Sequence, residues 1–510
     1  MFNRQLAAEL GFDPDWLSSA GGIDFLMGRQ PPAGAEPVAQ AYAGHQFGNF
    51  VPLLGDGRAV LLGEIETPAG QVIDLHLKGS GRTAFSRGGD GLAPLAAMLR
   101  EYIISEAMHG LGIPTSRSLA VIDPGWQVVR NTPQRAGLLV RTAPSHLRVG
   151  SFQYAAARQL ADPGSTLTRR LAEFAIERHF SDLLPGNQSA AATDSTSSTA
   201  ATGGHPDTYR RFIEAVCDRQ AGLVASWMGI GFVHGVLNTD NVTVGGFTID
   251  YGPCAFLDNH DPAAVFSSID TAGRYRFDQQ PAVMQWNMAR FIDSVLPLVF
   301  DGRPTIGGPA HSFAMEQRAR FGNRILDCHD RLLHRKLGLA AVPPTDPDHT
   351  RNKQLVHDFL RLLATHHPDH TRAFDLLTQA AHSRRGTGRS PATAPGDGGN
   401  RATDTIHRAV AEVFCGAGAG TSAAAPLLGW LHRWLRTDPD PEVMSRTNPV
   451  HIPRNHVVDR AIAEAVDGEM ALFNETLAAV TAPFDRRCRH DSTRMPPPAG
   501  SPACTTFCGT

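Results

Sequence analysis

The pattern of apolar and polar residues predicts a β-rich first third and a helical remainder. Residues 58–66 and 72–78 have strand character and are separated by the turn Pro68-Ala69-Gly70. Further strands are expected at 119–122, 126–129 and 137–142. A helix is expected at 92–110, where Gly110 is a typical terminating residue.

After residue 145 the pattern becomes helical, first at 152–184, then at 207–229, and again from about residue 281. The stretch 186–206 is small and polar and predicts a flexible insertion. This order favours an α+β, two-lobed fold with additional C-terminal helices. Its expected parts are a lead-in at 1–50 with one short helix, a β-rich lobe at 51–145, a helical lobe at 146–300, a helical extension at 301–485 and a flexible cysteine-containing tail at 486–510.

Composition narrows the class of protein. The 510 residues are enough for a large core, and 42% of them are hydrophobic, as in ordinary globular proteins. A net charge of −3 gives no electrostatic case for a nucleic-acid or anionic-membrane partner. There is no apolar run of about 18 residues and no signal-peptide core, and the seven cysteines are scattered as reduced thiols would be. We therefore expect a cytoplasmic protein, and a monomer.

The strongest chemical signal is the segment His234-Gly-Val-Leu-Asn-Thr-Asp-Asn241, followed by Asp250-Tyr-Gly. In kinases the catalytic loop has the sequence H-R-D-L-x-x-x-N and is followed by a metal-binding D-F-G motif. Here the spacing from His to Asn is kept, but Val236 stands where the catalytic aspartate should be. The segment 242–249 has Gly245-Gly246 at its middle and predicts a tight hairpin that would bring Asn241 and Asp250 together. An amide oxygen and a carboxylate suit Mg²⁺.

Lys78 closes the strand at 72–78, and Glu101 lies on the following helix. In kinases a strand lysine holds the nucleotide phosphates and a helix glutamate positions that lysine. Two unrelated surface charges are the alternative. The order of parts favours the pair, because strand lysine, helix and downstream loop follow one another as in a kinase. It predicts a protein-kinase-like two-lobed fold in which the β-rich lobe, 51–145, binds nucleotide.

Other candidates are weaker when each is taken alone. Gly55-Asp-Gly-Arg58 could approach phosphate through its backbone or be an ordinary β-turn. A second glycine-rich run, 79–91, follows Lys78 directly. Arg141 and Arg148 could form bidentate contacts with phosphate, or be two of many surface arginines. Asp240, next to Asn241, could replace the missing base or be a plain turn residue.

These residues make the family recognisable. The chain resembles the selenoprotein O family, also called the YdiU family, of kinase-like protein adenylyltransferases. The resemblance covers most of the chain, and three of its most specific motifs are Leu75-His-Leu-Lys-Gly-Ser-Gly-Arg-Thr83, His234–Asn241 and Asp250-Tyr-Gly-Pro253. It also includes Tyr42–Gly48, Leu54–Arg58, Phe85–Gly91, Arg100–Tyr102, Arg141-Thr142, His146–Gly150, Gln285–Asn287, Asn448-Pro449 and Thr506–Thr510.

The resemblance implies that ATP is bound inverted relative to kinases and that AMP, or UMP from UTP, passes to Ser, Thr or Tyr hydroxyls of protein substrates. Asn241 and Asp250 would bind Mg²⁺ or Mn²⁺, Asp240 would accept the proton, and Glu101 would orient Lys78. The nucleotide would be held by Gly55, Gly57, Arg58, Lys78, Asp90, Gly91, Arg141, Arg148 and Asp250.

Two other functions stay open at this point. A phosphotransferase is one, since antibiotic kinases write H-G-D-x-x-x-x-N, although Val236 removes their base. An ATP-binding pseudokinase scaffold is the other, because scaffolds can keep a nucleotide site. The tail cysteines Cys504 and Cys508 could respond to redox conditions or be idle thiols.

Overall fold

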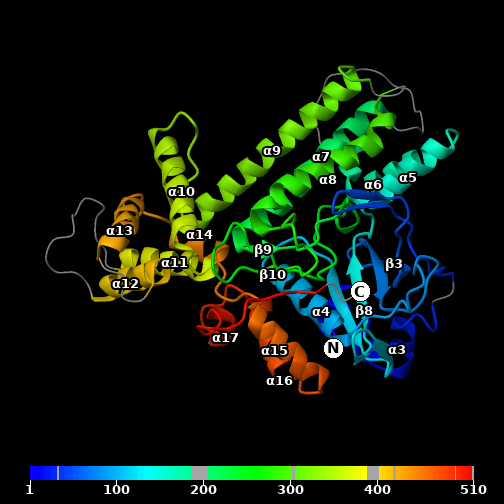
Figure 1. Cartoon of the computed structure of the whole chain (residues 1–510), viewed down its shortest axis with the longest axis horizontal. Helices are drawn as coiled ribbons and strands as arrows, with labels where there is room; N and C mark the ends of the chain where they lie inside the picture. Colours follow the sequence, from blue (N-terminus) through cyan, green and yellow to red (C-terminus); the bar gives the residue numbers. More distant parts are fainter. Residues whose placement is uncertain are drawn as a thin grey trace.

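The computed structural model describes residues 1–31, 34–184, 205–300, 305–386, 401–416, 421–488 and 490–507. The fold class is α+β, as predicted: a β-rich part comes first and a larger helical part follows (Figure 1). Most of the predicted insertion 186–206, and Cys508, lie outside the described residues.

The main sheet has four antiparallel strands. Their order is β3 (Ala59–Glu66), β4 (Val72–Lys78), β8 (Leu138–Ala143) and β5 (Arg117–Ile122). All four coincide with predicted strands. The strand predicted at 126–129 forms as β6 (Gln127–Val129), but it pairs only with β7 (Pro133–Arg135), outside this sheet.

The alternation within β4 explains how the sheet serves two purposes. Successive side chains of a strand point to opposite faces. Leu75 and Leu77 are buried in a cluster with the N-terminal helices, while His76 and Lys78 face the other way, toward the helical part. One face of the strand therefore builds the core, and the other carries polar chemistry.

The first 50 residues differ from the single short helix expected there. They contain α1 (Arg4–Glu9), α2 (Pro14–Leu17) and α3 (Ala20–Leu26), then a hairpin of β1 (Gly44–Gln46) and β2 (Asn49–Val51). The N-caps Asn3, Asp13 and Ser19 each accept a backbone hydrogen bond. Helices this short have too few turns to show a hydrophobic period.

The helical stretch predicted at 152–184 is broken in two. Helix α5 (Val149–Ala161) ends before Asp162-Pro163-Gly164, and α6 (Leu167–His179) begins after it. Proline disfavours helical backbone at the residue before it, and glycine weakens a helix, so this tripeptide ends α5.

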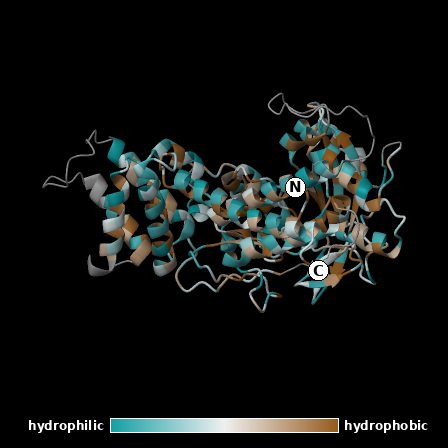
Figure 2. Cartoon of the chain, turned by 90° about the horizontal axis from the view of Figure 1, so that it is seen from above, coloured by the Kyte–Doolittle hydropathy of each residue, from teal (hydrophilic) through white to brown (hydrophobic). Residues whose placement is uncertain are grey.

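Long helices form two cores. Residues of α4 (Leu95–Gly110), α7 (Pro206–Ile230) and α8 (Gln280–Val295) build the larger one. Helix α9 (Pro309–Lys336) begins in this core and ends in the second, with Phe321 in the first and Leu333 in the second. Figure 1 shows α9 crossing from one part to the other, and Figure 2 shows hydrophobic and hydrophilic residues alternating along the helices. The second core lies among α10 (Pro347–His366), α11 (His370–Gly386), α12 (Arg401–Cys415) and α13 (Thr421–Leu435), beside α14 (Pro441–Thr447).

The last helices return to the β-rich part. Helices α15 (Asn455–Val466) and α16 (Ala471–Thr481) pack against α4 (Figure 1). The segment predicted to be a flexible tail contains α17 (Asp491–Arg494), and it is anchored further on where Thr506 pairs with Ser267 and donates to the carbonyl of Pro253 at 2.7 Å. The remaining domain boundaries stay predictions.

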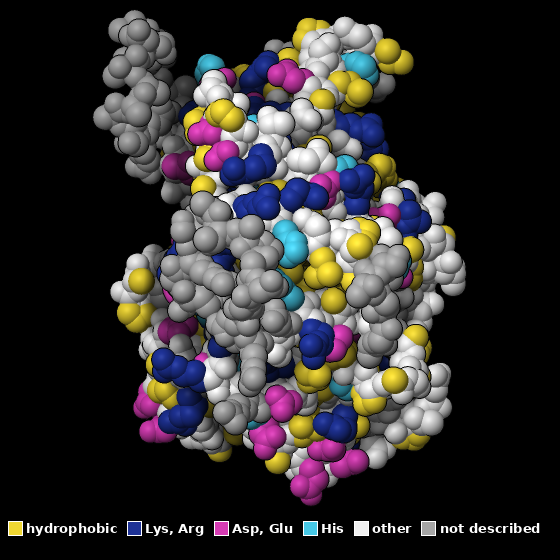
Figure 3. Space-filling view, turned by 90° about the vertical axis from the view of Figure 1, so that its left-hand side faces the viewer, with side chains coloured by type: hydrophobic (Ala, Val, Ile, Leu, Met, Phe, Trp, Pro, Cys, Tyr) yellow, Lys and Arg dark blue, Asp and Glu magenta, His cyan; other side chains and the backbone are white. Residues whose placement is uncertain are grey.

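Within the described ranges, no helix combines the length and apolar character that crossing a membrane requires. Figure 3 views the molecule from the end formed by the helical extension, where basic and acidic side chains are interspersed.

Candidate functional site

The residues predicted to handle nucleotide gather around one cavity of about 560 Å³. It lies between the sheet and the loop that follows β9 (Phe232–Val233). Glu101 does not line it but lies behind Lys78. The predicted residues that line it are Gly55, Gly57, Arg58, Lys78, Asp90, Gly91, Arg141, Arg148, Asp240, Asn241 and Asp250. Their individual roles stay predictions.

Three cationic side chains converge on the carboxylate of Asp250. Lys78 Nζ lies 3.0 Å from Oδ1, and Arg141 donates to the same oxygen at 2.6 Å. Arg148 donates to Oδ2 at 2.5 Å. Burial alone would raise the pKa of Asp250, but these cations outweigh it and hold the pKa well below its usual value. The carboxylate is therefore ionised.

The backbone at Asp250 is unusual as well. Its φ is 62°, in the left-handed region that residues with a side chain seldom adopt. Such strain persists only where the surroundings impose it, and it is concentrated at functional sites. The three cationic contacts supply that constraint here.

Glu101 ties Lys78 and Arg141 together from behind. It lies on the buried face of α4, with Oε2 2.5 Å from Lys78 Nζ and Oε1 3.1 Å from an Arg141 nitrogen. Lys78 and Arg141 each therefore contact two carboxylates, those of Glu101 and Asp250. Removing one partner of such a buried network leaves a charge uncompensated, which costs about 3–5 kcal/mol.

Positive charge dominates the cavity although the whole chain is slightly acidic. Six cationic side chains line it against four aspartates. The cationic ones are Arg58, Lys78, Arg87, Arg130, Arg141 and Arg148. A concave site with excess cations suits a polyanion such as a nucleoside triphosphate.

Asp240 occupies the same cavity on a single 3₁₀ turn, Thr239–Asn241. Its Oδ2 accepts a hydrogen bond from Gln46 at 3.2 Å, whereas Oδ1 is buried without a hydrogen-bond partner among the described residues. Burial raises the pKa of Asp240 to about 6. This carboxylate is more basic than an ordinary aspartate, as a proton acceptor needs to be. Val236, at the kinase base position, lines the cavity but carries no acid.

Asn241 is oriented by its own loop. Its side-chain nitrogen donates to the carbonyl of Val236 at 2.9 Å, which makes the amide oxygen the atom that could face a cation. Asn241 and Asp250 would supply oxygen ligands, the kind that Mg²⁺ or Mn²⁺ prefers. Mg²⁺ commonly takes one or two protein ligands and completes its shell with phosphate and water. No group of three His, Cys, Asp or Glu side chains within the described ranges could hold a metal by itself.

The hairpin predicted between Asn241 and Asp250 is not formed. Thr243 bridges to Arg148 and Thr248 bridges to Thr115, so the two arms pair with other segments rather than with each other. The turn is closed by a side chain instead: Thr243 Oγ1 donates to the carbonyl of Phe247 at 2.6 Å and accepts from its N–H at 3.1 Å. Apolar content and the two glycines indicated a turn correctly, but not the partners of its arms.

His76 was not predicted, yet it connects two parts of the site. Its Nε2 lies 3.2 Å from Asp56 Oδ2, and its Nδ1 accepts from Arg141 at 3.3 Å. Burial lowers the pKa of His76 to about 4, so the ring is neutral with its proton on Nε2. His146 stacks on it with ring centres 4.2 Å apart. The alternation of β4 could have indicated that His76 and Lys78 share a face.

The hairpin β1–β2 was also missed, because residues 1–50 were interpreted as a lead-in. Thr239 Oγ1 accepts from the N–H of His45 at 2.7 Å, and Asn238 Oδ1 accepts from that of Phe47 at 3.2 Å. With the Gln46 contact, three successive residues of the hairpin are joined to three successive residues of the catalytic-type loop. The motif Tyr42–Gly48, which contributed to the family resemblance, was the available signal.

Two predicted glycines have an evident packing reason. Gly55 has φ of 68°, and a Cβ there would lie 2.2 Å from the ring of Phe85. Gly91 has φ of 71°, and a Cβ there would lie 2.0 Å from the carbonyl oxygen of Gly81. The loop before β3 approaches the loop after β4 this closely at Gly55, and the loop after β4 folds this closely on itself at Gly91, only because these positions lack side chains. Asp90, at the rim, pairs with Arg130 at 2.8 Å.

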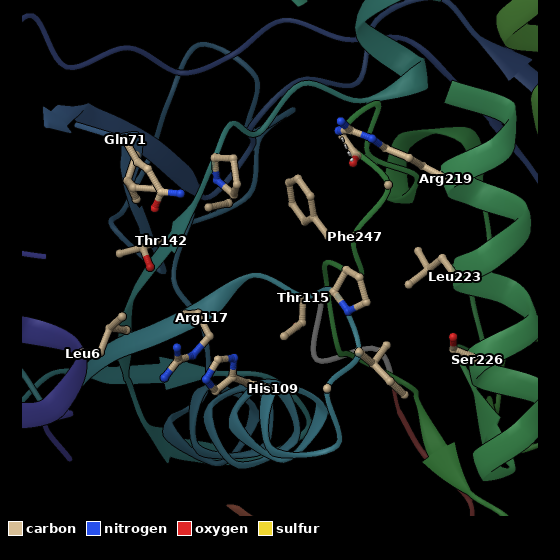
Figure 4. Close-up of a pocket in the computed structure, with 18 of the residues that line it drawn as sticks. Leu6, Gln71, His109, Thr115, Arg117, Thr142, Arg219, Leu223, Ser226 and Phe247 are labelled. Atoms are coloured by element: carbon tan, nitrogen blue, oxygen red, sulfur yellow. Dashed lines mark hydrogen bonds between the residues drawn. The ribbon is translucent and has the colours of Figure 1, made fainter. Parts of the chain in front are cut away.

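A larger cavity of about 1000 Å³ lies elsewhere and contains none of the predicted site residues. Figure 4 shows it between α7, with Leu223 and Ser226, and the end of α4, with His109. Thr142 of β8 lines it, whereas the preceding Arg141 lines the 560 Å³ cavity described above, called the nucleotide-type cavity from here on. Successive side chains of β8 point to opposite faces of the sheet, so the two cavities lie on opposite faces.

Comparison with known proteins places this geometry in context. A family model described as "Protein adenylyltransferase SelO" matches residues 1–481. A relative from Mycolicibacterium smegmatis, named "Protein nucleotidyltransferase YdiU", is 45% identical over 511 residues, covering 100% of this chain and 92% of the relative. Relatives of the same name from Corynebacterium efficiens and Cereibacter sphaeroides are 42% and 43% identical, again over 100% of this chain, and are covered to 91% and 93%.

Proposed function

Since this chain belongs to the SelO family of protein adenylyltransferases, whose relatives are named nucleotidyltransferases, we propose that it transfers AMP from ATP to Ser, Thr or Tyr hydroxyls of proteins and releases pyrophosphate. Transfer of UMP from UTP is a second use of the same chemistry. As a family member the chain is an enzyme of the nucleotidyltransferase class; the acceptor hydroxyls and the choice of nucleotide are the proposal.

The observation that supports this proposal is that one cavity contains two carboxylates whose pKa values are shifted in opposite directions. Asp250 is ionised and surrounded by three cations, while Asp240 has a pKa of about 6 and one buried oxygen with no hydrogen-bond partner among the described residues. Two acids whose surroundings push their pKa values apart are typical of divided catalytic roles. Asp240 accepts the proton of the attacking hydroxyl, and Asp250 belongs to the phosphate-binding apparatus.

The cations would serve the phosphates. Lys78, Arg141 and Arg148 neutralise the negative charge that develops at the α-phosphate and on the departing pyrophosphate. Glu101 keeps Lys78 and Arg141 in place, 2.5 and 3.1 Å away. Asn241 and Asp250 would hold Mg²⁺ or Mn²⁺, which supplies further charge neutralisation when bound.

The test is a paired labelling assay. The purified protein, a lysate as the source of acceptors, and Mg²⁺ or Mn²⁺ receive ATP labelled at either the α- or the γ-phosphate. We expect protein label from the α-position only, and its loss in Asp250→Ala. Asp240→Asn should retain ATP binding but lower transfer about 100- to 10,000-fold, because it removes the proton acceptor. Asp459→Asn, an exposed carboxylate paired with Arg100, is the matched control.

Two other outcomes would each replace the proposal. Label from the γ-position would establish a phosphotransferase and remove the reason for assigning Asp240 as the base. ATP binding without label from either position would establish an ATP-binding scaffold.

A further inference from the structure

A third cavity, of about 500 Å³, adjoins the nucleotide-type cavity. Phe47 lines both, and the preceding residue, Gln46, donates to Asp240. The two cavities therefore meet at the residue next to the one that contacts the proposed proton acceptor. Its lining is completed by Ala272, Gly273, Arg274, Arg276, Gln279 and Val283.

The boundary between the two cavities is held firmly. Phe47 has φ of 51°, and its N–H donates to Asn238 Oδ1 at 3.2 Å and to the Tyr275 hydroxyl at 3.0 Å. Its ring packs on Tyr275 with centres 5.1 Å apart, yet the side chain is 37% exposed. An aromatic group fixed at the edge of a catalytic cavity and open to solvent is suited to contact a second substrate.

The two arginines of the third cavity differ in how they are compensated. Arg276 forms an ion pair with Asp278 at 2.6 Å. Arg274 makes no ion pair with any carboxylate among the described residues; its guanidinium lies over Trp286 at 5.1 Å and over Tyr275 at 5.7 Å. The nearby Asp270 is occupied by backbone donors, the N–H groups of residues 274 and 275. The cavity thus has one cation that lacks a carboxylate partner.

We propose that this third cavity receives a side chain that flanks the acceptor hydroxyl of the protein substrate, and that Arg274 selects an aspartate or glutamate there. The occupant follows from position and charge: Phe47 lines both this cavity and the one that holds Asp240, and a carboxylate complements Arg274. The carbon stem of such a side chain lies against Phe47 and Val283. The inference rests on the proposed function and adds the sequence preference of its acceptors.

The experiment maps acceptor sites. Wild type, Arg274→Glu and Arg351→Glu are each incubated with intact lysate proteins, ATP and Mg²⁺, and the modified residues are located by mass spectrometry. Arg351→Glu makes the same charge change on α10, far from the cavity, where Arg351 pairs with Asp348. ATP affinity is measured separately for each protein, which shows that its nucleotide site has folded.

We expect acidic residues to be enriched within about three positions of hydroxyls labelled by wild type and by Arg351→Glu. In Arg274→Glu, labelling of these acidic acceptors should fall about fivefold or more, since a half-exposed ion pair is replaced by repulsion. Acceptors with a neighbouring lysine or arginine should gain label. Synthetic peptides of one such site, with Glu or Lys beside the hydroxyl, test the exchange directly.

Three outcomes decide the matter. The shift from acidic to basic neighbours supports the inference. Labelled sites without any charge preference, or with an apolar preference that Arg274→Glu leaves unchanged, overturn it while the proposed function stands. Absence of all labelling by wild type, with ATP still bound, overturns the proposed function and the inference with it.

Discussion

His76 shows how one neutral side chain can align two parts of a site. It donates to Asp56, in the turn before β3, and accepts from Arg141, which reaches Asp250. Asp56 is itself buried, and its pKa stays low because the hydrogen bond from His76 and the charges of Arg148 and Arg141 outweigh burial. A protonated His76 could not accept from Arg141, so the low pKa of the ring is part of the arrangement.

We expect His76→Ala to lower kcat/KM about 10- to 100-fold, because small misplacement of phosphate-binding groups is costly. His76→Gln should restore part of the loss, since an amide can donate to Asp56 and accept from Arg141. Labelling kinetics with varied ATP measure both. His260→Gln, a buried histidine that stacks on His370 in the helical extension, is the control for stability effects. If the Gln variant is as impaired as the Ala variant, His76 does not act through these two hydrogen bonds.

At the scale of elements, the hairpin β1–β2 belongs to the site although it lies far from it in sequence. Thr239 Oγ1 both accepts from the N–H of His45 and donates to Gln153 Oε1, at 2.7 and 2.6 Å. Through these two hydrogen bonds the hydroxyl connects the 3₁₀ turn that carries Asp240 to the hairpin and to helix α5.

Thr239→Val keeps the volume of the side chain and removes both hydrogen bonds of the hydroxyl. We expect a loss of about 1–3 kcal/mol in the free energy of unfolding, because two buried polar groups lose their partner. Transfer should fall more than ATP affinity does, since the hairpin carries Gln46 and Phe47 rather than the phosphate-binding cations. Urea unfolding, ATP titration and labelling are compared with Thr476→Val, a buried threonine of α16 that bonds only within its helix. Equal losses of transfer and ATP affinity would contradict this division.

Helix α9 joins the two cores and ends on a buried charge. Lys336 Nζ lies 3.9 Å from the ring centre of Phe374 in α11, and burial lowers its pKa to about 7. In the unfolded chain the lysine still binds its proton up to about pH 10.5. The penalty of burying the ammonium is therefore full below about pH 7 and disappears as pH rises toward 10.5.

Lys336→Met should accordingly be more stable than wild type at about pH 6, by about 2–4 kcal/mol. The gap should close as pH rises toward 10. Urea unfolding of both proteins at several pH values checks this, and a difference independent of pH would show that the ammonium is not buried in the folded protein.

Over the whole molecule, buried neutral histidines set the response to acid. Burial lowers the pKa of His76, His179 and His260 to about 4 and that of His146 to about 3. Between pH 6.5 and 4 the unfolded chain binds protons at these positions and the folded chain does not. Stability is therefore lost as pH falls through this window, by about 1.4 kcal/mol per pH unit for each group.

Asp240 acts in the opposite direction, because its raised pKa favours proton binding by the folded state below about pH 6. One such group is outweighed by four histidines. We expect cooperative unfolding between about pH 6 and 4, followed by tryptophan fluorescence. Replacing His260 by Gln should shift the transition to lower pH, and an unchanged midpoint would show that this histidine is not buried neutral.

Local patterns predicted much of this protein. The strands β3, β4, β5 and β8, the helix α4 and the order of lobes follow from periodicity, which depends on residues a few positions apart. Motif spacing indicated Lys78, Glu101, Asn241 and Asp250 for the same reason. The break at Pro163 and two of the three short N-terminal helices were missed, because the first lies within a continuing apolar pattern and the helices are shorter than one reliable period.

The sequence by itself therefore indicated the four strands of the main sheet, the helix α4 and the motif residues that line the cavity. Only the tertiary structure decided which of them meet. Lys78 and Asp250 are separated by 172 residues, and His45 and Thr239 by 194, so their contacts depend on how sheet, hairpin and loop are packed together. The constraints that make a motif recognisable act between residues that are near one another in the sequence. The convergence of cations on Asp250, the burial that raises the pKa of Asp240 and the cavity beside Phe47 arise from long-range packing, which no local pattern encodes.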